Sequence, residues 1–273
     1  MLPQEGELVT RRTTRKAPSR RQWPHDPESP VPWRPGYGSI SGMMTPLLLA
    51  LTTLLAQPSA PRFEQRTFTM SDGTSMRYGL SLPGDYSASR PRPLVLALHP
   101  GGGGAPYYGD GFLRSVFLPG LRDLAPIMIA PDVPGRAWTE PHAEQAVLAL
   151  VAAMRKEFAV DPRRIAVVGF SLGGAGTWHL SSRHPDLFTA AIVMAGRTEE
   201  PVAALGKMPT YVIHGRNDEV VPFAQADARA RALEKAGRSI RFEALPGVSH
   251  YDMGSYLDAL ARGGRWVAER WGT

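Results

Sequence analysis

The chain has 273 residues, no cysteine and a formal net charge of +6 at pH 7. This length suits one domain preceded by a leader, and without cysteine the chain has neither a disulfide framework nor a thiolate metal site. Residues 1–42 hold seven Lys or Arg and four Asp or Glu, which is half of the net charge, so the basic character of the chain is no argument for a nucleic-acid partner.

Two N-terminal segments precede any sign of a packed core. Residues 1–42 are rich in proline and lack apolar periodicity, which predicts a disordered leader, and we expect Met43 or Met44 to be the true start. Residues 43–56 contain an apolar stretch of about eleven residues, which is too short to span a bilayer and suits a signal peptide, with a buried core helix as the alternative. We therefore expect a secreted or periplasmic protein without a stable membrane span, whose mature form begins near Gln57.

Residues 57–273 alternate between short β-branched runs and amphipathic runs. An antiparallel pair is expected at 63–70 and 76–82. Further strands are expected at 93–98, 127–130, 165–168, 190–194, 210–213 and 240–245, and helices at 141–158, 174–184, 223–236 and 252–270. This order predicts the α/β class, with a mostly parallel doubly wound sheet and helices on both faces. Residues 195–208 are too few for a helical cap, so we expect no large cap and an open site.

The segment Gly169-Phe170-Ser171-Leu172-Gly173 lies between an expected strand and an expected helix. A strand, a G-x-S-x-G turn and a helix form a nucleophile elbow, which exposes the serine hydroxyl above the sheet. The alternative is a tight structural turn with a solvated serine. The elbow context makes Ser171 the candidate nucleophile.

Two residues that follow later strands supply a candidate acid and a candidate base. Asp218 follows the strand at 210–213 and His250 follows the strand at 240–245. The chain order serine, aspartate, histidine is that of α/β-hydrolases. Asp132 also ends a strand but precedes the serine, so we interpret it as a loop-bracing residue. The other six histidines are interpreted as structural.

A glycine run follows the strand at 93–98, in His99-Pro100-Gly101-Gly102-Gly103-Gly104. Glycine lets a substrate carbonyl approach the backbone closely. We expect Gly101 or Gly102 to donate one N–H to an oxyanion, and Leu172 to donate the other. No Lys-Ser or Lys-Thr follows the run, so nucleotide binding is not expected. No cofactor and no metal are predicted.

Aromatic residues near these loops have two interpretations. Trp138 lies in a loop bounded by proline and glycine, and Tyr107 and Tyr108 follow the glycine run. They either wall a substrate groove or cover the sheet edge. We name them as candidate substrate-binding residues.

These motifs resemble those of the α/β-hydrolases over residues 62–271. Within that fold, the chain is similar to a group of esterases that includes polyhydroxybutyrate depolymerases, feruloyl esterases and phospholipase-carboxylesterases, and to predicted peptidases of the prolyl-oligopeptidase type. The resemblance rests on the glycine run, the elbow, and the segments around Asp218 and His250. It implies Ser171 as nucleophile, Asp218 as acid and His250 as base. Pro100 stands where a glycine is more usual, which leaves open whether Gly101 or Gly102 donates.

The resulting prediction is a monomeric serine hydrolase that cleaves small or polymeric carboxylic esters through an acyl-enzyme. One alternative is a serine peptidase that acts on short peptides. Another is a binding protein on a hydrolase scaffold without activity. The fold hosts many chemistries, so the substrate rests on analogy.

Overall fold

The computed structural model describes residues 59–70, 72–102 and 104–272. The expected leader at 1–42 and the signal-like segment at 43–56 lie outside the described residues. Among the helices of the described ranges, none combines the length and the apolar character needed to cross a membrane.

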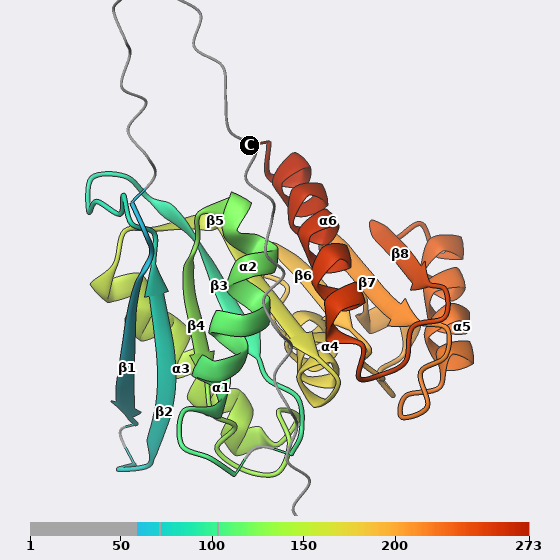
Figure 1. The fold of residues 1–273 in the computed structure, drawn as a ribbon, viewed down its shortest axis with the longest axis horizontal. Coiled ribbons are helices and arrows are strands. Elements are labelled where there is room, and N and C mark those ends of the chain that lie inside the picture. The colour runs from blue at the N-terminus through green and yellow to red at the C-terminus, as the bar shows by residue number, and fades with distance from the viewer. Residues whose placement is uncertain (1–58, 71, 103, 273) are drawn as a thin grey trace, which may run out of the picture. The chain divides into compact units, whose positions relative to one another are not determined.

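One sheet of eight strands organises residues 62–245, with the spatial order β1-β2-β4-β3-β5-β6-β7-β8 (Figure 1). The strands are β1 (Arg62–Thr69), β2 (Ser75–Leu82), β3 (Arg92–Leu98), β4 (Ile127–Pro131), β5 (Val160–Phe170), β6 (Ala190–Met194), β7 (Thr210–Gly215) and β8 (Ile240–Leu245). β2 pairs antiparallel with β1 and with β4, and every other pairing is parallel. The predicted mostly parallel doubly wound sheet is confirmed.

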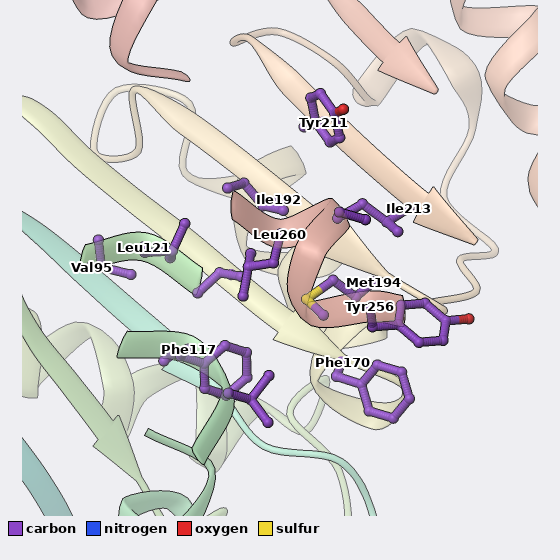
Figure 2. Close-up of a cluster of buried hydrophobic side chains, with 14 of the residues drawn as sticks. Val95, Phe117, Leu121, Phe170, Ile192, Met194, Tyr211, Ile213, Tyr256 and Leu260 are labelled. Atoms are coloured by element: carbon purple, nitrogen blue, oxygen red, sulfur yellow. The ribbon is translucent and has the colours of Figure 1, made fainter. Parts of the chain in front are cut away.

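Helices cover both faces of this sheet. They are α1 (Tyr108–Phe112), α2 (Leu118–Leu121), α3 (Pro141–Glu157), α4 (Leu172–Arg183), α5 (Phe223–Lys235) and α6 (Met253–Trp271). On one face, Leu121 of α2 and Leu260 of α6 pack with Val95 and Ile192 of the sheet (Figure 2). On the other face, alternate strand residues pack against α3, α4 and α5. Successive side chains of a strand point to opposite faces, so each strand serves both layers.

The region between the glycine run and β4 is helical, which the sequence did not predict. A π-helical turn (Leu113–Phe117) joins α1 to α2, and a 3₁₀ turn (Arg122–Leu124) follows. Gly109, Pro119 and Gly120 weaken the helical signal there. The helical turns form because they pack closely against β4. At Gly109 this packing is so close that a Cβ would come within 2.7 Å of the Ala130 carbonyl oxygen.

The carboxyl ends of the parallel strands meet at one edge of the sheet, which is where open α/β sheets hold their ligands. The turns after β3, β5, β7 and β8 carry the glycine run, Ser171, Asp218 and His250. Between β6 and β7 the only regular element is a 3₁₀ turn (Val202–Ala204). The expected absence of a large cap is therefore confirmed for the described residues.

Candidate active site

The nucleophile elbow begins where β5 ends. Ser171 has φ 55° and ψ −113°, a strained conformation for a residue with a side chain. Its N–H donates to the Met194 carbonyl at 2.9 Å, which anchors the turn to β6. A Cβ on Gly169 would overlap the Gly173 carbonyl, and a Cβ on Gly173 would overlap the Leu98 carbonyl. Both glycines are therefore required for the elbow to approach its neighbours so closely.

The structure brings Ser171, His250 and Asp218 into one chain of hydrogen bonds. The Ser171 Oγ lies 2.9 Å from His250 Nε2, and His250 Nδ1 lies 2.8 Å from Asp218 Oδ2. A carboxylate can only accept, so Nδ1 carries the proton and Nε2 is left to accept from the serine hydroxyl. This is the arrangement that serine nucleophiles need.

The Asp218 carboxylate is held by hydrogen bonds, with no Lys or Arg among its described partners. Its Oδ1 accepts the N–H groups of Val220 at 2.9 Å and of Val221 at 2.7 Å. Its Oδ2 faces His250, and His214 Nε2 also lies 3.3 Å from it. The side chain is fully buried. Backbone donors fix the orientation of the carboxylate and leave one oxygen for the imidazole.

His250 is fixed by its backbone as well as by its ring. Its N–H donates to the Glu219 carboxylate at 3.1 Å. Its ring contacts those of Phe170 and Tyr251, with centroids 5.0 and 5.3 Å away. Phe170 in turn packs edge-on against Tyr256 of α6 (Figure 2). The Tyr256 hydroxyl accepts the Gly215 N–H at 2.9 Å, so α6 supports the ends of both β5 and β7.

His214 is a buried neighbour of Asp218. Its Nε2–H donates to the Val221 carbonyl at 2.8 Å. Burial lowers its pKa, which favours the neutral ring. Its Nδ1 has no hydrogen-bond partner among the described residues. The structural interpretation of His214 agrees with these contacts, but its closeness to Asp218 was not predicted.

The glycine run is braced by His99, and its first glycine contacts the elbow. His99 Nδ1–H donates to the Pro100 carbonyl at 2.6 Å, and Nε2 accepts the Val133 N–H at 3.0 Å. Burial lowers the pKa of His99, which suits this neutral tautomer. A Cβ on Gly101 would lie 3.9 Å from the Leu172 side chain, so this glycine passes close to the elbow, and Gly102 has φ +91°. The assignment of the oxyanion N–H to Gly101 or Gly102 stays a prediction.

Trp138 is not a wall of a substrate groove, and that prediction is wrong. The residue is 1% exposed. Its indole N–H donates to the His99 carbonyl at 3.0 Å, and its side chain packs against Gly176 of α4. It lies behind the glycine run, where it supports the loop. Tyr107 and Tyr108 are half-buried beside that loop, and their contact with substrate stays a prediction.

Asp132 holds the loop that carries these tyrosines. Its carboxylate accepts the N–H groups of Tyr107 at 2.8 Å and of Gly109 at 3.0 Å. Arg77 lies 3.7 Å away. These contacts agree with a loop-bracing residue.

A groove of about 390 Å³ lies near this edge but outside the hydrogen-bonded chain. It is lined by residues 196–199 and residues of α5 together with Trp178, Val212 and Val221, and none of Ser171, Asp218 and His250 lines it. No group of three or more His, Cys, Asp or Glu in the described ranges is arranged to hold a metal ion.

Two residues near the site were missed from the sequence. Val220 is 48% exposed and Tyr251 is 72% exposed. Each stands alone on a loop, so no periodic pattern marks it.

Known proteins are similar to this chain in sequence and in fold. A model of the dienelactone hydrolase family matches residues 133–252. A probable feruloyl esterase C of Aspergillus niger is 29% identical over 157 residues, which cover 54% of this chain and 56% of the relative. A putative esterase, NocK, of Nocardia uniformis is 30% identical over 152 residues, which cover 52% and 44%. The matched regions thus span about half the length of these relatives.

Solved structures show the same fold. A thermostable esterase superimposes with a TM-score of 0.63 at 25% identity, over 77% of this chain and 60% of the other. A feruloyl esterase module of Clostridium thermocellum complexed with sinapinate superimposes with a TM-score of 0.62 at 15% identity, over 75% and 88%. The chain therefore has the α/β-hydrolase fold, and about half of it is similar in sequence to proteins described as esterases.

Proposed function

We propose that this chain hydrolyses carboxylic esters through an acyl-enzyme formed on Ser171. The observation that carries the proposal is the hydrogen-bonded series from the Ser171 hydroxyl through His250 to the buried Asp218 carboxylate. The similarity to esterases supports an ester rather than an amide substrate. No observation of the described residues favours the peptidase alternative or a silent binding protein.

In the proposed first half-reaction, His250 Nε2 takes the proton of Ser171 as its Oγ attacks the ester carbonyl carbon. Asp218 holds the imidazole in the correct tautomer and stabilises the cation that forms. The oxyanion accepts hydrogen bonds from Leu172 N–H, at the start of α4, and from Gly101 or Gly102 N–H. When the intermediate collapses, the carbon–oxygen bond to the alcohol breaks and His250 gives its proton to the departing oxygen.

In the second half-reaction, a water molecule gives a proton to His250 and attacks the acyl carbon. Collapse of this intermediate returns the proton to Ser171 and releases the acid. Every step uses side chains and amides of this chain, and none requires a cofactor.

The absence of a large cap supports access for bulky or polymeric esters. Relatives described as feruloyl esterases support aromatic acids among the substrates. We further propose that the protein acts as a monomer outside the cytoplasm. The apolar segment at 43–56 and a relative described as an uncharacterized secreted protein, 24% identical over 250 residues, support this location.

The decisive test is Ser171→Ala in the full chain, assayed with p-nitrophenyl acetate. Loss of a nucleophile of this kind costs on the order of 10⁴-fold or more in kcat. Ser115→Ala is the matched control, because the Ser115 hydroxyl only donates to the Gly111 carbonyl on the π-helical turn. A fluorophosphonate should label the wild type and the control but not Ser171→Ala. Retention of more than about a tenth of the wild-type rate in folded Ser171→Ala would refute the proposal.

A further inference from the structure

Two large apolar side chains stand exposed beside the site, in contrast to the rest of the described chain. Tyr251 is 72% exposed and Val220 is 48% exposed, and no other large hydrophobic side chain of the described residues is exposed. Tyr251 directly follows His250, and Val220 lies two residues after Asp218. Neither belongs to a core cluster, so the packing of the fold does not account for them.

Val220 and Tyr251 lie on adjoining loops. We call these two side chains the apolar rim. The Glu219 carboxylate accepts the His250 N–H at 3.1 Å, so the residue before Val220 contacts the residue before Tyr251. The Tyr251 ring meets the His250 ring edge to face, at an angle of 85°. The rim therefore adjoins the imidazole that faces Ser171.

An exposed aromatic residue beside an imidazole suits contact with an apolar ligand. Aromatic side chains contribute a large apolar area, and tyrosine tolerates a surface that is alternately wet and covered. Exposed apolar patches, unlike apolar residues scattered singly over a surface, mark ligand-binding sites. Glu219 is also exposed here, and its carboxylate disfavours an anionic substituent.

The breakdown of the tetrahedral intermediate determines which part of an ester lies near the apolar rim. His250 Nε2 must reach the oxygen of the departing alcohol to protonate it. The alcohol portion is therefore held beside His250, whereas the carbonyl oxygen points toward the amides of Leu172 and the glycine run. We propose that Val220 and Tyr251 bind a neutral, aryl-sized alcohol portion of the ester. This inference rests on the proposed function.

The test compares three esters that change one side at a time. Ethyl acetate is the reference, benzyl acetate enlarges the alcohol, and ethyl 3-phenylpropanoate enlarges the acid. In Tyr251→Ala, the ratio of kcat/KM for benzyl acetate over ethyl acetate should fall about tenfold. The ratio for ethyl 3-phenylpropanoate over ethyl acetate should change by less than about twofold. Tyr251→Phe keeps the ring and should retain the benzyl preference, and Val220→Ser should reduce it about threefold.

Each contrary result has a distinct meaning. A uniform loss on all three esters in Tyr251→Ala would make the ring a shield of His250 and overturn the inference. A loss confined to ethyl 3-phenylpropanoate would place the acid on the rim and would also overturn it. Unchanged ratios in both Tyr251→Ala and Val220→Ser would do the same. Failure of the proposed function looks different, because wild-type protein would then cleave none of the esters and would resist the fluorophosphonate.

Discussion

The loops after β4 and β7 each place an aspartate at the same edge of the sheet, yet only one aspartate reaches an imidazole. Both carboxylate oxygens of Asp132 accept hydrogen bonds from the N–H groups of Tyr107 and Gly109, which lie far away in sequence. Asp218 accepts the N–H groups of Val220 and Val221 with Oδ1 alone. Its Oδ2 therefore accepts no backbone N–H of the described residues and lies 2.8 Å from His250 Nδ1 and 3.3 Å from His214 Nε2. The role of a strand-end aspartate depends on which oxygen its own loop leaves available.

His99, which directly follows β3, and His214, which lies near the end of β7, also differ in how many of their ring nitrogens have hydrogen-bond partners. His99 uses both ring nitrogens, one for the Pro100 carbonyl and one for the Val133 N–H. His214 uses Nε2 for the Val221 carbonyl, while its Nδ1 has no partner in the described structure. His99 therefore ties two loops together, whereas His214 supports a single loop beside a buried charge.

The largest expected effect separates the two aspartates. Asp218→Asn should lower kcat for p-nitrophenyl acetate by about 10⁴-fold, because the amide favours the wrong tautomer of His250. Asp132→Asn should cost less than about tenfold and should act mainly through stability, since it weakens a loop brace. Kinetics and thermal midpoints of both variants check this. A severe loss of turnover in well-folded Asp132→Asn, with near-normal Asp218→Asn, would reverse the assignment.

A smaller effect separates the two histidines. His214→Leu removes the donor that holds the acid loop, and kcat should fall by about tenfold, with little change in KM. His214→Gln can place an N–H near the same carbonyl and should restore most of the rate. In His99→Leu we expect KM to rise as well, because the glycine run loses its brace. If His214→Leu and His99→Leu changed kcat and KM equally, and if His214→Gln did not restore the rate, the proposed difference between the two histidines would be wrong.

The smallest effect on turnover, and a separate effect on stability, is expected at Glu144 of α3. Burial alone would raise its pKa, but hydrogen bonds from His179, His184 and Arg183 lower it to about 2. The carboxylate therefore stabilises the fold above the pKa of about 4.3 that it has when unfolded, and this contribution is lost as the pH falls toward 2.

The free energy of unfolding of Glu144→Gln in urea, measured at several pH values, tests whether this carboxylate, rather than the loops of Asp132 and Asp218, makes stability depend on pH. The variant should be less stable than the wild type by about 2 kcal/mol at pH 7, and the difference should shrink as the pH approaches 2. A constant difference across that range would show that the charge of Glu144 is not responsible. Acid inactivation that persists unchanged in the variant would then originate near the active-site loops.

Much of the fold could be predicted because short β-branched runs end at glycine or a polar residue. The strands expected at 190–194 and 240–245 agree with β6 and β8 at both ends. The helical region from Tyr108 to Leu124 could not be predicted, since Gly109 and Pro119 obscure its periodicity and its packing against β4 is a tertiary effect. The interpretation of Trp138 failed for a similar reason, because sequence does not reveal which side of a loop an aromatic residue takes.

The candidate site could be predicted as far as the positions of its residues along the chain. Ser171, Asp218 and His250 each follow a parallel strand, and the ends of such strands converge. The contact of His214 with the acid depends on which ring nitrogen faces inward. The exposure of Tyr251 depends on the path of one loop. Neither the contact of His214 nor the exposure of Tyr251 can be predicted from the spacing of residues in the sequence.

The support that α6 gives to the site has a consequence for the time at which activity can begin. Tyr256 joins Gly215 of β7 to Phe170 of β5, and His250 lies three residues before the first residue of this helix. Along the chain, Ser171 and Asp218 come before His250 and the helix that supports these residues. Domains generally fold as units. Under the proposed function, a chain without a packed α6 would lack this support at the ends of β5 and β7, so we expect hydrolysis to require the last helix to be in place.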